Sequence, residues 1–157
     1  MKIITYKSEH KINYPVGSYI QHNLPIIEKM ANKLHHLYGK NDAQINLWCS
    51  GSSGAIIASL VAQKFENATI LHVKKEQEAS HSNNEFFISS YITVINIIVD
   101  DFVQTGSTIN RIRMAMKNSR TGLNIDCIAL GERVPEGSKT AMLLKTFNPD
   151  TVVCIND

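Results

Sequence analysis

The chain lacks a charge excess of either sign and lacks a long apolar run. Its 16 lysines and arginines nearly balance its 14 aspartates and glutamates, and a net charge of +2 gives no reason to expect binding to nucleic acid or to a membrane surface. No apolar stretch reaches the roughly 20 residues of a membrane span, because Asn96 interrupts the longest one. We therefore expect neither a nucleic-acid partner nor a membrane.

Cysteine is also scarce. Cys49, Cys127 and Cys154 lie far apart in apolar runs and show no Cys-x-x-Cys spacing. This pattern favours buried, reduced thiols over a disulfide framework, with a metal ligand or a nucleophile as the alternative. The first six residues lack the apolar segment of a secretory signal. Together these absences predict a cytoplasmic protein.

The length and the hydrophobic pattern predict one α/β domain over residues 1–157, with a core over about residues 40–157. Apolar positions at three- and four-residue spacing predict helices, and short apolar runs rich in β-branched residues predict strands. Pro25 is a candidate first residue of the first helix, with Asn23 as its cap. After a short N-terminal strand, the predicted helices cover residues 19–38, 54–65, 107–118 and 138–147, and the predicted strands cover residues 45–49, 69–73, 91–99, 125–130 and 151–155.

Strands that alternate with helices indicate a Rossmann-like parallel sheet flanked by helices. Such sheets bind ligands at the carboxyl ends of their strands, near the switch in strand order. Cys49, Lys74 and Asp100 each follow a predicted strand end. We therefore expect the loops after them to share one edge of the sheet.

The most informative segment covers residues 97–108. An apolar run ends in Asp100 and Asp101, and three residues later a turn rich in hydroxyl groups opens a helix. Paired carboxylates can accept hydrogen bonds from sugar hydroxyls or hold a hydrated cation. The turn can offer hydroxyls, backbone N–H groups and a positive helix end to a phosphate. The segment is therefore predicted to bind a sugar phosphate, the alternative being a buried strand that ends in a solvated acidic turn.

This segment, IIVDDFVQTGST, resembles the phosphoribosyl pyrophosphate (PRPP) motif of the type I phosphoribosyltransferases and matches every fixed position of it. The resemblance implies that family's fold, with a small hood to which the N-terminal segment contributes. It implies that Asp100 and Asp101 are catalytic and bind the ribose hydroxyls, directly or through the water shell of Mg²⁺. It assigns the rest of the PRPP site to Gln104, Thr105, Gly106, Ser107 and Thr108.

Gln104 departs from part of the family. In its purine-salvage members an aspartate often precedes the Thr-Gly pair and handles the proton of the base, whereas glutamine cannot titrate. This difference argues against a hypoxanthine-guanine type of mechanism. It leaves orotate-like, adenine-like and non-nucleobase acceptors open.

A second loop is rich in serine and glycine, and it lacks a nucleophile-elbow, Walker or dinucleotide pattern. Taken alone, it fits an ordinary tight turn equally well. In the phosphoribosyltransferases a loop at this place holds pyrophosphate, and the resemblance implies that role here. The residues concerned are Ser50, Gly51, Ser52, Ser53 and Gly54.

A third loop, over residues 74–90, is long and polar, which is typical of a mobile lid that excludes water during reaction. Its start resembles the Val-Arg-Lys segment of orotate-type phosphoribosyltransferases, with Lys74 in place of the arginine and bidentate phosphate binding lost. The resemblance implies that Lys74 and Lys75 bind pyrophosphate, and that Lys75 and His81 take part in catalysis. The alternative is that all three are solvated surface residues.

The acceptor pocket is the least defined part of the sequence. The loop over residues 131–137, with Arg133, is one candidate, and Tyr6, Tyr14 and Tyr19 are candidates to complete the hood.

We therefore expect a Mg²⁺-dependent phosphoribosyltransferase that moves a 5-phosphoribosyl group from PRPP to an unidentified nitrogenous base, and by the same resemblance a homodimer. One alternative is a non-catalytic regulator that binds PRPP or a nucleotide on this fold. Another is a sugar-phosphate-binding domain that uses residues 50–54 as its main phosphate loop.

Overall fold

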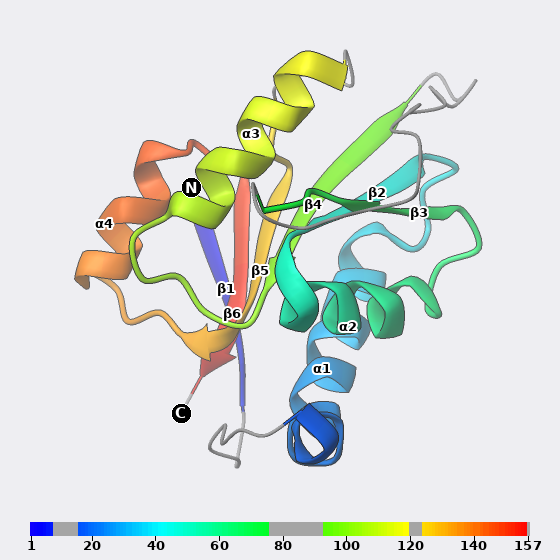
Figure 1. Ribbon diagram of the computed structural model, residues 1–157, viewed down its shortest axis with the longest axis horizontal. Helices are drawn as coiled ribbons and strands as arrows, with labels where there is room; N and C mark the ends of the chain where they lie inside the picture. Colours follow the sequence, from blue (N-terminus) through cyan, green and yellow to red (C-terminus); the bar gives the residue numbers. More distant parts are fainter. Residues whose placement is uncertain (8–15, 76–92, 120–123, 157) are drawn as a thin grey trace.

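The computed structural model describes residues 1–7, 16–75, 93–119 and 124–156 (Figure 1). Six strands form one sheet in the order β1-β6-β5-β4-β2-β3, and every neighbouring pair is parallel. This arrangement confirms the predicted fold class. In chain order the elements are β1 (Lys2–Lys7), α1 (Val16–Tyr38), β2 (Gln44–Cys49), α2 (Gly51–Ala62), β3 (Ala68–His72), β4 (Val94–Asp100), α3 (Ser107–Ser119), β5 (Cys127–Arg133), α4 (Lys139–Thr146) and β6 (Thr151–Asn156).

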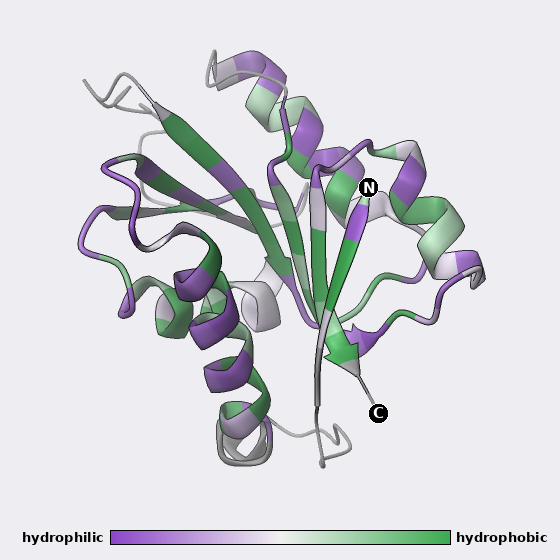
Figure 2. Ribbon diagram, turned by 180° about the vertical axis from the view of Figure 1, so that it is seen from behind, coloured by the Kyte–Doolittle hydropathy of each residue, from purple (hydrophilic) through white to green (hydrophobic). Residues whose placement is uncertain are grey.

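The sheet is the middle of three layers. Helices α1 and α2 cover one face and helices α3 and α4 cover the other (Figure 1). Successive residues of β2 supply both cores: Leu47 packs on the α1/α2 side and Trp48 on the α3/α4 side, each fully buried. Figure 2 accordingly shows the central strands as largely hydrophobic between more hydrophilic helices. Burial on both faces explains the continuous apolar run of β4.

The strand order changes direction between β2 and β4. From β2 the chain passes through α2 to β3 at one edge, then returns to β4 on the other side of β2. Trp48 lies beside Ile98 in the register, so the two strands end together at Cys49 and Asp100. A parallel sheet splays its crossovers at such a point and leaves a crevice at the carboxyl ends of the strands.

Several element boundaries differ from the predictions. Helix α1 begins at Val16 and runs through Pro25, so Pro25 does not mark its start. Apolar residues that follow the proline, such as Ile26 and Met30, are buried in the core, and this packing outweighs the hydrogen bond that proline removes. Helix α2 begins at Gly51, so most of the predicted serine-glycine loop is a helical turn. Strand β5 continues to Arg133, which shortens the predicted loop after it.

The N-terminal part of the chain contributes to the core, which the prediction began near residue 40. Strand β1 pairs with β6 over its whole length, and α1 contributes several fully buried apolar side chains to the α1/α2 core. These two elements extend the central layers. Tyr14 and the side chains of Tyr6 and Tyr19 lie outside the described residues.

The three cysteines are buried and free, as predicted. Burial raises the pKa of Cys49 and Cys127 to about 12, which keeps these thiols protonated and unreactive at neutral pH. In the described segments, no helix is both long enough and apolar enough to cross a bilayer.

Candidate functional site

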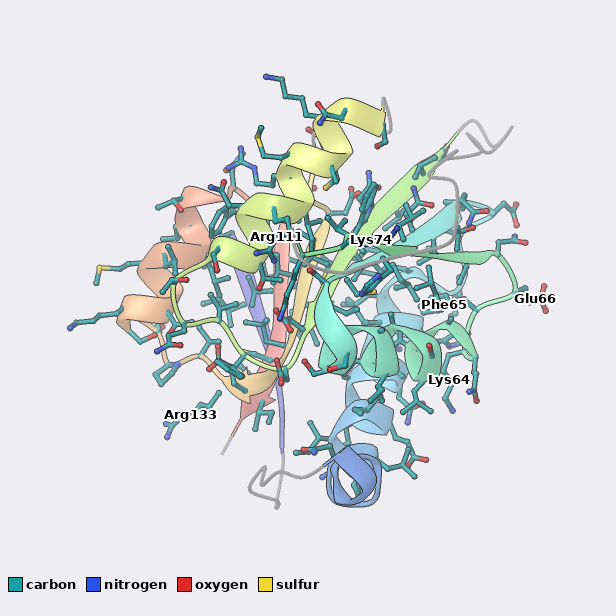
Figure 3. The ribbon with its side chains drawn as sticks, viewed as in Figure 1. Lys64, Phe65, Glu66, Lys74, Arg111 and Arg133 are labelled. Atoms are coloured by element: carbon teal, nitrogen blue, oxygen red, sulfur yellow. The ribbon has the colours of Figure 1, made fainter. Side chains whose placement is uncertain are left out.

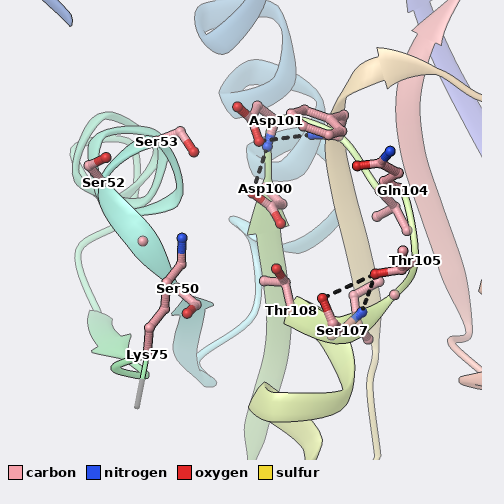
Figure 4. Close-up of a pocket in the computed structure, with 15 residues that line it drawn as sticks. Ser50, Ser52, Ser53, Lys75, Asp100, Asp101, Gln104, Thr105, Ser107 and Thr108 are labelled. Carbon is pink, nitrogen blue, oxygen red and sulfur yellow. Dashed lines mark hydrogen bonds between the residues drawn. The ribbon is translucent and has the colours of Figure 1, made fainter. Parts of the chain in front are cut away.

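A cleft of about 330 Å³ opens at the carboxyl ends of β2 and β4 (Figure 4). Residues 100–109 form one side of it, here called the motif wall. Residues 50–53 together with Lys75 form the opposite side, here called the serine wall. The cleft thus lies at the switch in strand order, where the parallel topology favours a ligand site.

The acidic pair lies at the base of the motif wall. Asp100 and Asp101 are only 5% and 4% exposed. The backbone N–H of Asp101 donates to Asp100 Oδ1, and that of Phe102 donates to Asp101 Oδ1, both at 3.0 Å. Burial, a hydrogen bond with Asp101 and the like charge of Asp101 raise the pKa of Asp100 to about 8, while the positive charge of Lys75 acts in the opposite direction. At neutral pH the Asp100 carboxyl therefore holds a proton, which a bound cation would displace.

The far end of the motif wall is a turn followed by the first residues of α3. Thr105 Oγ1 donates to Ser107 Oγ at 3.1 Å and accepts from the Ser107 backbone N–H at 3.4 Å. Gly106 has a φ of +76°, and a Cβ added there would lie 2.8 Å from Cζ of Phe147. Glycine is thus required both by conformation and by space. The turn presents hydroxyls and the N-terminus of a 13-residue helix to the cleft, which suits an anion.

Strand β5 holds the segment between the acidic pair and this turn. The Val103 backbone N–H donates to Glu132 Oε1 at 2.7 Å. A Cβ added to Gly131 would lie 3.2 Å from the carbonyl oxygen of Asp101, so the end of β5 packs directly on the motif wall. Sequence reasoning missed Glu132, because nothing in the sequence pairs it with Val103, 29 residues away.

The serine wall is built from two separated segments, the start of α2 and the chain after β3. Ser50 adopts the extended N-cap conformation of α2 but makes no side-chain capping bond; its Oγ instead accepts from Nη1 of Arg111 at 3.4 Å. Gly51 has a φ of +76°, and a Cβ added there would lie 3.4 Å from both Cε and Nζ of Lys75. Because the Val73 backbone N–H donates to the Cys49 carbonyl at 2.8 Å, the chain after β3 brings Lys75 beside this turn. A helix N-terminus and the Lys75 side chain therefore lie across the cleft from the acidic pair.

Most of the predicted site residues gather in this cleft. Lys74 is absent from the lining. Gly54 is also absent: it is buried in α2, where an added Cβ would lie 3.3 Å from Cβ of Cys49. His81 lies outside the described residues. The predicted residues that do line the cleft are Ser50, Gly51, Ser52, Ser53, Lys75, Asp100, Asp101, Gln104, Thr105, Gly106, Ser107 and Thr108.

Besides Glu132, sequence reasoning missed Phe102 and Arg111. Phe102 lines the cleft with 48% of its surface exposed, directly after the acidic pair. Arg111 lies on the same side of α3 as Ser107 and Thr108, and this helical spacing was the available signal. Among the residues that the structure describes, no three histidine, cysteine or acidic side chains cluster as a metal site.

No family model matches the chain, and no curated protein matches it. Among solved structures, the chain is similar to adenine phosphoribosyl transferase from Trypanosoma brucei, determined in complex with AMP, pyrophosphate and ribose-5-phosphate, with a TM-score of 0.58 and 14% sequence identity over 99% of this chain and 77% of that chain. Hypoxanthine phosphoribosyltransferase from Staphylococcus aureus is a weaker match, with a TM-score of 0.43 and 10% identity over 85% of this chain and 74% of that chain. The Trypanosoma structure confirms the fold that the resemblance implied, that of the type I phosphoribosyltransferases.

Proposed function

We propose that this protein is a Mg²⁺-dependent phosphoribosyltransferase, which transfers a 5-phosphoribosyl group from PRPP to a nitrogenous base and releases pyrophosphate. One observation carries the proposal: the acidic pair and the hydroxyl-rich turn lie on one wall of a single cleft, opposite a helix N-terminus and Lys75. PRPP presents a phosphate, sugar hydroxyls and a diphosphate, and each of these groups has a chemical counterpart here. The similar Trypanosoma enzyme was determined with AMP, pyrophosphate and ribose-5-phosphate.

In this proposal, each wall of the cleft binds a different part of PRPP. On the motif wall, the turn at Thr105 and the start of α3 bind the 5′-phosphate, and the acidic pair accepts hydrogen bonds from the ribose hydroxyls. On the serine wall, the first turn of α2 and Lys75 bind the diphosphate. This division places the anomeric carbon between a pair of acids and a cationic anion site.

This arrangement stabilises both charges that develop during transfer. As the bond from the anomeric carbon to the diphosphate lengthens, positive charge grows on the ribose and negative charge grows on the leaving group. Asp100 and Asp101 face the ribose, while Lys75 and the N-terminus of α2 face the leaving group. Positioned charge and orientation therefore supply the catalysis.

The acidic pair also fits a magnesium ion. Mg²⁺ binds through one or two carboxylates and completes its octahedral shell with waters and substrate phosphates. Asp100 and Asp101 supply the carboxylates, and the facing anion site places the phosphates across the cleft from them. When bound, Mg²⁺ would offset part of the negative charge of the leaving diphosphate.

Residues between the acidic pair and the turn indicate what acceptor fits. The exposed ring of Phe102 offers a stacking surface to a planar base. In the described part of the cleft, the titratable side chains are Asp100, Asp101 and Lys75. Gln104 cannot remove a proton, so the acceptor nitrogen must attack without a base at that position.

The arrangement of the cleft also favours a second function. A cleft that binds PRPP without a titratable group at position 104 also suits a regulator that senses PRPP. By the resemblance we further propose a homodimer, which sedimentation equilibrium tests.

Calorimetric titration of PRPP with Mg²⁺, followed by measurement of pyrophosphate release across a panel of bases, separates the two functions. Binding with base-dependent release establishes the transferase and names its acceptor. Binding without release from any base supports the regulator. No binding rejects both.

A further inference from the structure

Arg111 occupies a place that the proposed function does not use. It lies in the second turn of α3 (Figure 3), partly exposed, with its guanidinium at the edge of the serine wall. Its Nη1 donates to Oγ of Ser50, which is 4% exposed and lines the cleft. Arg111 thus reaches from the helix of the motif wall to the wall opposite.

The hydrogen bond to Ser50 positions the guanidinium but uses only part of its hydrogen-bonding capacity. A guanidinium carries five N–H donors in a planar fork, and this bond uses one of them at 3.4 Å, which is long for an N–H···O bond. A charged phosphate oxygen makes a shorter and stronger bond to such a donor. A diphosphate entering the cleft can therefore compete with the serine hydroxyl for this donor or bind the rest of the fork.

Arg111 also supplies a chemistry that the serine wall otherwise lacks. Lys75 lies against Gly51 and offers a point charge, whereas only a guanidinium binds two phosphate oxygens side by side. The segment after β3 carries lysines at both Lys74 and Lys75, so that fork is not provided there.

We propose that Arg111 is a diphosphate-binding residue of the cleft, and that Ser50 keeps its guanidinium at the serine wall while the site is empty. The inference rests on the proposed function, because it assigns a ligand to the same cleft. It commits to the leaving-group end of PRPP: Arg111 contacts the diphosphate, and the 5′-phosphate binds at the turn formed by Thr105 and Ser107.

Arg113 provides a matched control on the same helix. Its Cζ lies 5.7 Å from the centroid of the Phe147 ring, on the side toward α4. Arg113→Gln and Arg111→Gln remove the same charge from positions two residues apart. A general electrostatic effect would therefore appear in both variants.

The test is calorimetric titration of inorganic pyrophosphate with Mg²⁺, and separately of ribose 5-phosphate, into the wild-type protein and its variants. We expect Arg111→Gln to weaken pyrophosphate binding roughly 10- to 100-fold, the range for a hydrogen bond to a charged group, and to leave ribose 5-phosphate within about twofold. Arg111→Lys should fall between because it keeps charge without the fork, Ser50→Ala should lose a few-fold, and Arg113→Gln should match wild type. Circular dichroism melts confirm that each variant folds.

Two results overturn the assignment. One is unchanged pyrophosphate affinity in Arg111→Gln. The other is equal loss for pyrophosphate and ribose 5-phosphate, which would show a structural effect. Failure of the proposed function looks different: the wild-type protein would bind neither PRPP nor ribose 5-phosphate. In that case the wild-type protein could still bind pyrophosphate, and loss of this binding in Arg111→Gln but not in the other variants would support Arg111 as a diphosphate ligand. If the wild-type protein bound none of PRPP, ribose 5-phosphate and pyrophosphate, both proposals would be rejected.

Discussion

The two walls of the cleft are built in different ways. The motif wall is one continuous segment of ten residues, from Asp100 to Ile109, which leaves the central strand β4 and enters α3. The serine wall combines the start of α2, the segment after β3 and, by our proposal, a side chain of α3. Each wall contains a glycine with a positive φ, Gly106 and Gly51, but the charged groups of the motif wall are buried acids, whereas Lys75 is exposed and Arg111 is half-buried.

This difference predicts how strongly a substitution on each wall affects ligand binding. Removing one member of a buried acidic pair leaves buried polar groups without partners, and this disturbs the whole segment around it. A wall made of separate cations can lose one contact and keep the others, because each charge acts through space. We therefore expect substitutions on the motif wall to abolish binding and substitutions on the serine wall to weaken it, and the following experiments test that contrast.

The largest effect should come from the acidic pair. Asp100→Asn combined with Asp101→Asn removes the oxygens proposed to hold ribose and cation, and we expect PRPP affinity to fall at least about 100-fold, since several charge-assisted contacts are lost together. Lys75→Met on the serine wall should cost roughly tenfold. Titration of PRPP into each variant measures both. Retained affinity in the double variant would instead support a sugar-phosphate site centred on residues 50–54.

The shape of the motif wall depends on Gly106. We expect Gly106→Ala to lower the free energy of unfolding by about 2 to 4 kcal/mol, because the new methyl group meets Phe147 and the residue keeps a positive φ. Gly137→Ala is the control: its φ is +74°, but no atom lies within 4 Å of an added Cβ. It should cost only about 1 kcal/mol of strain. Urea unfolding of the two variants compares them, and equal losses would show that crowding at Phe147 contributes nothing.

Much of the motif wall could be predicted from the sequence, because its chemistry is contiguous. A buried parallel strand must end where apolar residues give way to acids, and Thr105 and Gly106 sit at the turn into the next helix. The alternation of elements likewise predicted the sheet. Lys75 was placed by the same logic, since it follows a strand end.

The rest depends on contacts between distant segments. Ser50 was predicted to lie in a loop, whereas it is the N-cap residue of α2, which begins at Gly51. Gly54 reads as a phosphate contact, although its missing side chain serves packing against Cys49. Pairings such as Arg111 with Ser50 join residues 61 positions apart, and no local pattern encodes them.

The burial of Asp100 should also appear in the pH dependence of stability. Its pKa is about 8 in the folded protein and about 3.9 in an unfolded chain, so folding favours the protonated form. The stability that this group contributes is complete below pH 4 and is lost as the pH rises toward 8. Asp100→Asn removes that loss, and we expect the variant to be more stable than wild type by about 1 to 3 kcal/mol at pH 8 and nearly equal at pH 4.

Urea unfolding of both proteins at the two pH values tests this expectation. Asp42→Asn, at an exposed position, controls for the loss of one charge. A stability difference that did not grow with pH would contradict the burial argument. Confirmation would mean that the acidic pair is retained at the expense of stability, as is usual for a binding site.

The smallest effect should come from the support behind the motif wall. Glu132 does not line the cleft, yet its carboxylate accepts the Val103 backbone N–H at 2.7 Å. Glu132→Ala leaves that N–H without its acceptor and loosens the segment between the acidic pair and the turn, so we expect PRPP affinity to fall about three- to tenfold. Glu132→Gln retains an acceptor oxygen and should therefore keep most of the wild-type PRPP affinity. If the negative charge of Glu132 were what matters, both variants would bind PRPP equally weakly. Hydrogen exchange of the Val103 amide, faster in Glu132→Ala than in Glu132→Gln, would tie the loss of affinity to this one bond and show that even the contiguous wall needs a contact from a distant strand.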